Sequence, residues 1–146
     1  MEVQLKMNIP QMNNYGHAYL DELENDAHPF SYTCKPTDSR MEKWTNQRAV
    51  YGFDDSETWD LNSTFYAWLY ERLRMYIDVG GEVVDLGFHK FNWKGNEYTQ
   101  REIIEMILDH IHFYFSEEYN DFDEDDVAYI NEIGELWALV LPAMWW

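Results

Sequence analysis

The chain has 146 residues, in which ten lysines and arginines face 28 aspartates and glutamates, so the formal net charge at pH 7 is −18. This charge disfavours direct binding to DNA, RNA or an anionic membrane, because all three carry the same sign. Acidic chains with few aromatic residues are often disordered, but this one contains 7 Trp, 11 Tyr and 8 Phe and can build a dense core. We expect an irregular arm over residues 1–16 and a single domain over residues 17–146.

Three features bear on the location of the protein in the cell. The chain has no run of about 18 apolar residues, which predicts no transmembrane helix, and its first residues lack the pattern of a signal peptide. Cys34 is the single cysteine, which excludes an intrachain disulfide and a cysteine-based zinc site. Together these features predict a cytoplasmic protein.

The first helices predicted along the chain are short. Apolar spacing predicts one over residues 17–26, which stops before His28-Pro29 because the residue before a proline disfavours helical geometry. Asp38 or Ser39 is the expected N-cap of a second helix that continues through Arg48. The chain has one basic stretch, most of which lies in that helix: Lys35, Arg40, Lys43 and Arg48. We expect these cations to pair with the acidic C-terminal half of the chain; the alternative is that they form a surface for a partner.

The clearest helix begins at Leu61 and ends at Gly80-Gly81. Acidic residues come directly before it, where the positive end of the helix dipole favours negative charge. Three- and four-residue spacing predicts its inner face as Leu61, Phe65, Trp68, Leu69, Leu73 and Tyr76. The next stretch predicts a small hairpin within about residues 83–98, with a turn at Lys94-Gly95-Asn96.

Two further helices follow. Thr99 and Glu102 form the pattern of a capping box, and the expected inner face behind it consists of Ile103, Met106, Ile107, His110 and Tyr114. A last helix runs from Val127 to Pro142, with Ile130, Ile133, Trp137 and Leu141 on one side. The fold class predicted is therefore mainly α, a single-domain helical fold with one small β-hairpin.

Catalytic and metal-binding patterns are weak. Asp109 and His112 have the carboxylate–imidazole spacing of di-iron bundles, but the helix at 61–79 offers only Glu71 and Asp78 as further ligands. Cys34 lacks the surroundings of an activated nucleophile, and no phosphate-binding glycine motif is present. We expect no enzyme activity, no metal and no cofactor.

The strongest functional candidate is the acidic run at residues 117–126, because no Lys or Arg follows Arg101. The run lacks the glycine of a calcium loop. Its carboxylates could reproduce the charge spacing of a nucleic acid, with Tyr119 and Phe122 as apolar anchors; the alternative is a solvated loop that keeps the protein soluble. The predicted partner-binding residues are Glu117, Glu118, Tyr119, Asp121, Phe122, Asp123, Glu124, Asp125 and Asp126, with Glu102, Glu105 and Asp109.

The chain ends in two tryptophans, Trp145 and Trp146, where most chain ends are polar. We expect these side chains to dock on the core; the alternative is an apolar patch for a homodimer or a target.

The stretch Gly52-Phe53-Asp54-Asp55-Ser56-Glu57-Thr58-Trp59-Asp60-Leu61-Asn62, with Trp68-Leu69-Tyr70-Glu71-Arg72-Leu73 behind it, resembles small proteins of bacteriophages and prophages. The resemblance covers about residues 50–80 and 99–115 and brings no catalytic residues with it. It implies a phage origin, and hence a place in the cytoplasm of a bacterial host.

Acidity and this resemblance lead to one hypothesis. The chain is expected to be a phage-encoded inhibitor of anti-CRISPR or anti-restriction type, which binds the basic nucleic-acid channel of a host nuclease or CRISPR effector partly as a nucleic-acid mimic. The alternative is a phage structural or assembly accessory protein. A metal-dependent enzyme is the least favoured hypothesis.

Overall fold

A computed structural model describes residues 9–13, 16–23 and 37–145. In this part of the chain the fold is mainly α with one two-stranded antiparallel hairpin, which confirms the predicted fold class. Expectations that rest on residues 1–8, 24–36 and 146, including Cys34, Lys35 and Trp146, lie outside the described residues. No helix in the described ranges is long and apolar enough to cross a membrane.

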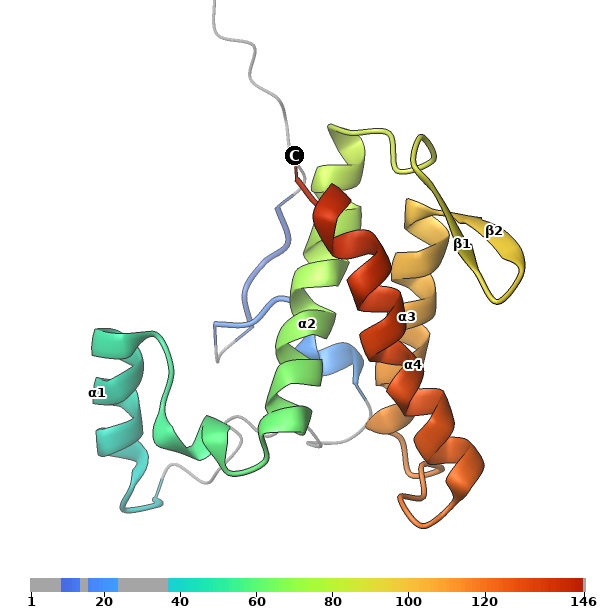
Figure 1. The fold of residues 1–146 in the computed structure, drawn as a ribbon. Coiled ribbons are helices and arrows are strands. Elements are labelled where there is room, and N and C mark those ends of the chain that lie inside the picture. Colours follow the sequence, from blue (N-terminus) through green and yellow to red (C-terminus); the bar gives the residue numbers. More distant parts are fainter. Residues whose placement is uncertain (1–8, 14–15, 24–36, 146) are drawn as a thin grey trace, which may run out of the picture.

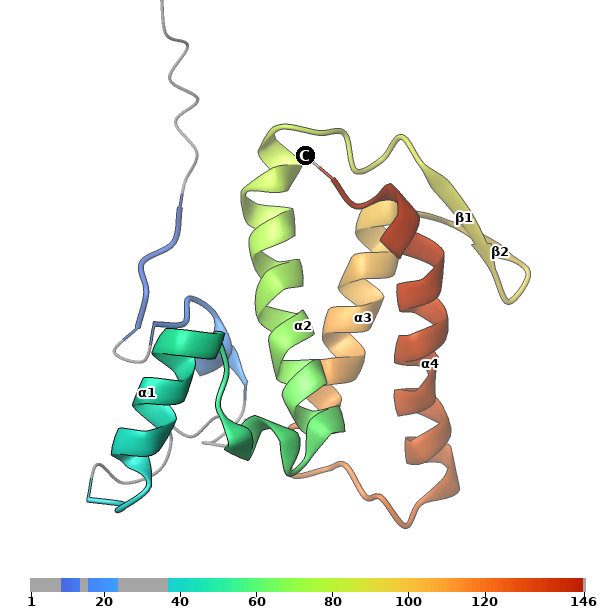
Figure 2. The same cartoon turned by 60° about the vertical axis from the view of Figure 1, so that its left-hand side comes forward.

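Three helices form the main body, and they lie side by side in both views (Figures 1 and 2). They are α2 (Leu61–Asp78), α3 (Gln100–Tyr114) and α4 (Glu124–Val140). Their facing sides are aliphatic, and each fully buried Leu or Ile contributes about 1.5–3 kcal/mol to folding. The most buried members of this core are Ala67, Leu69, Leu73, Ile103, Ile104, Ile107, Ile111, Ile133, Leu136 and Val140.

The start of α3 follows the predicted capping box. The Thr99 side chain accepts a hydrogen bond from the Glu102 amide (3.1 Å), and the Glu102 carboxylate accepts one from the Thr99 amide (3.0 Å). The buried face of α3 is wider than predicted. Ile104, Leu108 and Ile111 are buried as well, because α3 packs against α2 on one side and α4 on the other.

The hairpin consists of β1 (Lys90–Trp93) and β2 (Asn96–Thr99), with Trp93 opposite Asn96. Lys94 (φ 49°) and Gly95 (φ 79°) both have positive φ, as a two-residue type I′ turn requires. The turn is thus confirmed, although the strands begin later than residue 83. The Trp93 indole donates to Glu135 (3.3 Å) and Lys94 pairs with Glu132, so the hairpin is fixed against α4.

The bounds of α2 are as predicted, but part of its predicted inner face is wrong. Leu61, Phe65 and Trp68 are 64%, 38% and 40% exposed. The helix instead turns a stripe containing Ala67 and Glu71 inward, because Glu71 binds the N-terminal segment. Spacing alone missed this, since a buried glutamate interrupts the apolar pattern.

The N-terminal segment runs along α2 and contains the 3₁₀ helix η1 (Leu20–Glu22) in place of the longer helix predicted from residue 17. The Glu71 carboxylate accepts the Ala18 amide (2.7 Å) and contacts the His17 imidazole. The Arg74 guanidinium donates to Glu22 (2.7 Å). Polar contacts therefore fix this segment where an amphipathic helix was expected.

Helix α1 (Met41–Tyr51) and the 3₁₀ helix η3 (Asp55–Thr58) lie to one side of the three-helix body (Figure 1). The predicted N-cap of α1 is wrong: the cap position is Arg40, and the Asp38 carboxylate accepts the Arg40 amide (2.9 Å) before the helix begins. At the other end, Gly52 (φ 82°) donates its amide to the Arg48 carbonyl (3.0 Å), a backbone conformation that favours glycine.

The C-terminal helix α4 begins at Glu124, three residues before the predicted start, because Asp123 caps it. It ends at Val140 and is followed by the 3₁₀ helix η5 (Leu141–Ala143), which contains Pro142. Leu141 is 51% exposed and Trp145 is 72% exposed. The expected docking of the terminal tryptophans on the core is therefore wrong for Trp145.

Candidate functional site

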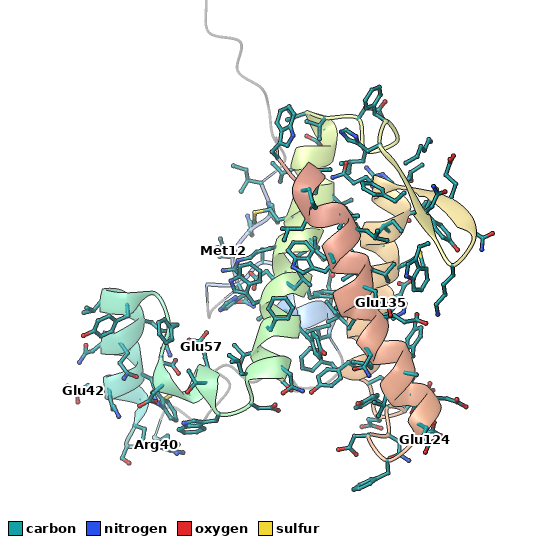
Figure 3. All side chains as sticks on the ribbon, in the orientation of Figure 1. Met12, Arg40, Glu42, Glu57, Glu124 and Glu135 are labelled. Carbon is teal, nitrogen blue, oxygen red and sulfur yellow. The ribbon has the colours of Figure 1, made fainter. Side chains whose placement is uncertain are left out.

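The acidic turn, residues 117–126, joins α3 to α4. It lies at the end of the three-helix body away from the hairpin (Figure 2). Figure 3 places Glu124 at this end and Glu135 well along α4, while Arg40 and Glu42 belong to α1 on the far side of the body. The acids of the turn therefore occupy one end of the molecule, separated from the basic residues of α1.

Two acids of the turn hold its backbone. Asp123 Oδ1 accepts the amides of Asp125 (2.9 Å) and Asp126 (3.2 Å), which caps α4. Asp126 Oδ2 accepts the Asn120 amide (3.0 Å), and the Asn120 side chain accepts the Phe122 amide (3.0 Å). These bonds fix the path of the loop, so Asp123 and Asp126 have structural roles.

Glu118, Asp121, Glu124 and Asp125 are exposed acids of the turn that take no part in these backbone contacts. None of them forms an ion pair with a Lys or Arg in the part of the chain that the structure describes. The last cation in the sequence is Arg101, near the other end of α3. Their charge therefore projects outward from a turn whose path is held by Asp123 and Asp126.

The two predicted apolar anchors differ sharply. Tyr119 packs inward, with its ring 6.0 Å from Phe113 and 5.0 Å from Tyr114, and burial raises the pKa of its hydroxyl. Phe122 is 93% exposed. The structure thus assigns Tyr119 to the scaffold and leaves Phe122 as a large apolar group presented among carboxylates.

The predicted acids on α3 do not join this cluster. Glu102 caps the opposite end of α3, and the 15 residues of that helix span about 22 Å at 1.5 Å per residue. Glu105 and Asp109 face the groove between α2 and α3, which has a volume of about 260 Å³ and is also lined by Arg74 and His112. The twelve predicted residues therefore divide into a compact turn and a separate stripe along α3.

The basic residues of α1 are engaged near α1 itself. Arg40 pairs with Asp38 (2.9 Å), and Lys43 pairs with Asp55 (2.7 Å). Arg48 pairs with the buried Asp54 (2.6 Å). The expectation that these cations pair with the acidic C-terminal half is wrong, because the acids just outside α1 are much closer.

The described side chains show no cluster with metal-binding geometry. In residues 9–13, 16–23 and 37–145 there is no group of three or more His, Cys, Asp or Glu side chains that could hold an ion. Asp109 and His112 lie on the same groove between α2 and α3, where Glu105 is the one further carboxylate among the described lining residues. What the acidic turn offers is negative charge and one exposed aromatic ring.

Comparisons with known proteins give no relative: no family model, curated protein or solved structure matches the chain.

Proposed function

We propose that the chain is a phage-encoded acidic inhibitor that binds the basic nucleic-acid channel of a host nuclease or CRISPR effector, acting partly as a nucleic-acid mimic. The observation that carries the proposal is the acidic turn itself. Asp123 and Asp126 hold its backbone, and Phe122 is 93% exposed. Asp121, Glu124 and Asp125 present charge that no Lys or Arg of the described residues pairs with.

Basic channels that track a phosphate backbone are built for a dense row of negative charges, about one per 1.7 Å of a DNA duplex. Carboxylates held on a fixed turn can compete for such a channel, and their field accelerates the encounter with a positively charged surface. Charge alone gives little affinity after desolvation, whereas an aromatic side chain that enters a pocket can supply much of the binding energy. Phe122 is placed to provide that contact.

A phage structural or assembly accessory protein is the second candidate, and a specific observation favours it. Leu61, Phe65 and Trp68 form an exposed apolar stripe on α2, and Trp145 is 72% exposed at the chain end. Exposed apolar patches of this kind are typical of protein–protein contacts, including contacts between copies of one chain.

The decisive experiment captures partners from nuclease-treated host lysate on the tagged protein, first at low and then at high salt. The proposal expects a basic nuclease or effector subunit that is released by salt. The test variant is D121N/E124Q/D125N, and its matched control is E42Q/E82Q/E97Q, which removes the same number of exposed carboxylates from other elements. Asp123 and Asp126 are left unchanged because their loss would disturb the loop.

Capture that is lost in the acidic-turn variant and kept in the control supports the proposal. Equal capture by both variants contradicts it. Phe122→Ala separates the apolar contribution to binding from the electrostatic one. This variant should bind more weakly at every salt concentration, whereas the triple variant should mainly reduce the salt dependence of binding. Salt-insensitive self-association that is lost in Trp68→Ser would favour the assembly role.

A further inference from the structure

A second site lies at the opposite end of the molecule from the acidic turn. Four segments meet there around a cavity of about 420 Å³: the end of α2, the connector between η4 (Gly80–Glu82) and β1, the start of α3, and the chain after α4. They line it with the aromatic side chains of Tyr76, Phe88 and Trp145. Its volume falls in the range of small-molecule sites, about 300–1,000 Å³.

Polar contacts hold this cavity in shape. The Tyr76 hydroxyl donates to the carbonyl of Trp145 (3.3 Å). Gln100, which is 2% exposed, donates from its side-chain amide to the Tyr76 hydroxyl (3.2 Å) and to the Ala143 carbonyl (3.4 Å). Because α2 and α3 both bind the C-terminal segment, Trp145 is kept at the cavity although its side chain is not buried.

The aromatic side chains remain accessible. Phe88 is 74% exposed and Trp145 is 72% exposed, although both carry large apolar surfaces that folding normally covers. The faces of such rings carry partial negative charge and attract organic cations, and several rings around one space form an aromatic cage.

The polar groups at the cavity favour a cation over an anion. Among the described residues that line the cavity, Asp85 supplies the one carboxylate, and it uses Oδ1 to accept the Gly87 amide (2.9 Å). The first amides of the adjacent helix α3 are already engaged: Gln100 donates to the His89 carbonyl (3.2 Å) and Arg101 to the Leu86 carbonyl (3.1 Å). An anion would therefore find no free helix donor there, while the net charge of −18 attracts cations.

We propose that this cavity binds a small organic ammonium ion, with its alkylated head among the rings of Tyr76, Phe88 and Trp145 and with Asp85 as the counter-charge. The site is independent of the acidic turn, so it stands or falls separately from the proposed function. His89 also lines the cavity, and a protonated imidazole would oppose a cation. Titrations should therefore be run at about pH 8.

The test is a titration of the full chain with choline, followed by NMR of the tryptophan indole N–H groups. Its matched probe is 3,3-dimethylbutan-1-ol, which has the shape of choline without the charge. We expect choline to shift the Trp145 signal in a saturable way, with affinity at least about tenfold above that of the alcohol. Equal affinity for the two probes, or no saturable shift with choline, would overturn the proposal.

Variants locate the site. Trp145→Leu and Phe88→Leu should each weaken choline binding about tenfold, and Asp85→Asn about threefold. Trp59→Leu is the control, because Trp59 is similarly exposed (63%) but is not part of this cavity. All three cavity positions are exposed, so the variants should fold, which circular dichroism can verify. Unchanged binding in Trp145→Leu, or an equal loss in Trp59→Leu, contradicts the assignment.

Discussion

Two acidic segments of this protein look alike in sequence and behave differently in structure. In the first, at residues 54–57, Asp54 is 1% exposed, accepts the Arg48 guanidinium (2.6 Å) and caps η3. Asp55 accepts the Trp44 indole (2.7 Å). In the second, the acidic turn, several carboxylates face solvent and pair with no Lys or Arg in the part of the chain that the structure describes.

The comparison shows that acidity along a chain does not by itself mark a binding surface. The segment at residues 54–57 uses its charge to fix α1 against η3. The acidic turn instead uses two acids for its own backbone and leaves others facing outward. Carboxylates without internal partners are the ones available to another molecule. The predictions below test that division.

The largest effect is expected at Asp54. Asp54→Ala removes a buried acceptor from Arg48 and Ser56 and should lower the free energy of unfolding by about 2–3 kcal/mol, below the loss for a fully buried pair because Arg48 can turn toward water. Urea unfolding followed by circular dichroism measures it. Asp121→Ala serves as the control, with an expected change within about 0.5 kcal/mol. Similar losses in the two variants would remove the distinction.

An intermediate effect is expected inside the acidic turn. Asp123→Ala removes the cap of α4 and should cost about 1 kcal/mol, whereas Glu124→Gln removes a favourable charge at the same helix end and should cost a few tenths. The same unfolding measurement compares them. A smaller loss for Asp123→Ala than for Glu124→Gln would mean that the cap does not hold the turn.

Much of the main body could be predicted from sequence, because its signals are local. The capping box at Thr99 and the turn at Lys94-Gly95 depend on residues a few positions apart, and both are confirmed. The inner face of α2 depended on a distant contact: Glu71 is drawn inward by the segment around Ala18, 53 positions earlier. The spacing of apolar residues within a helix carries no information about such a distant contact.

The candidate sites show the same limit. The sequence predicts both Tyr119 and Phe122 as apolar anchors, because both lie within the acidic run. Nothing in the spacing distinguishes Tyr119, which packs against Phe113, from Phe122, which stays exposed. The cavity at Trp145 could not be predicted from the sequence, because its lining comes from segments that are far apart along the chain: α2, the connector before β1, the start of α3 and the chain after α4. The one signal available was the unusual pair of terminal tryptophans.

At low pH the protein should lose the stability that partnered carboxylates such as Glu132 contribute. Burial alone would raise the pKa of Glu132, but hydrogen bonds from Lys94 and His110 outweigh it and lower the pKa below its ordinary 4.5. A depressed folded-state pKa gives stability that is present above about pH 4.5 and is lost as the pH falls through the folded value. Thermal unfolding at fixed ionic strength should therefore show a falling Tm below about pH 4.5, with a shallower fall in Glu132→Gln. An unchanged acid limb in that variant would exclude this contribution.

The smallest effect should come from the carboxylates that matter most for the proposed function. D121N/E124Q/D125N should change the free energy of unfolding by no more than about 0.5 kcal/mol at physiological salt, because loss of the helix-end charges at Glu124 and Asp125 opposes the relief of repulsion. When unfolding is measured from low to high salt, the free energy of unfolding should rise more for the wild type than for the variant. Salt screens the repulsion between the carboxylates of the wild type, whereas the variant has already lost that repulsion. A loss as large as that expected for Asp54→Ala would make the exposed acids part of the scaffold. The acidic turn would then resemble the segment at residues 54–57, and its charge would no longer indicate a partner.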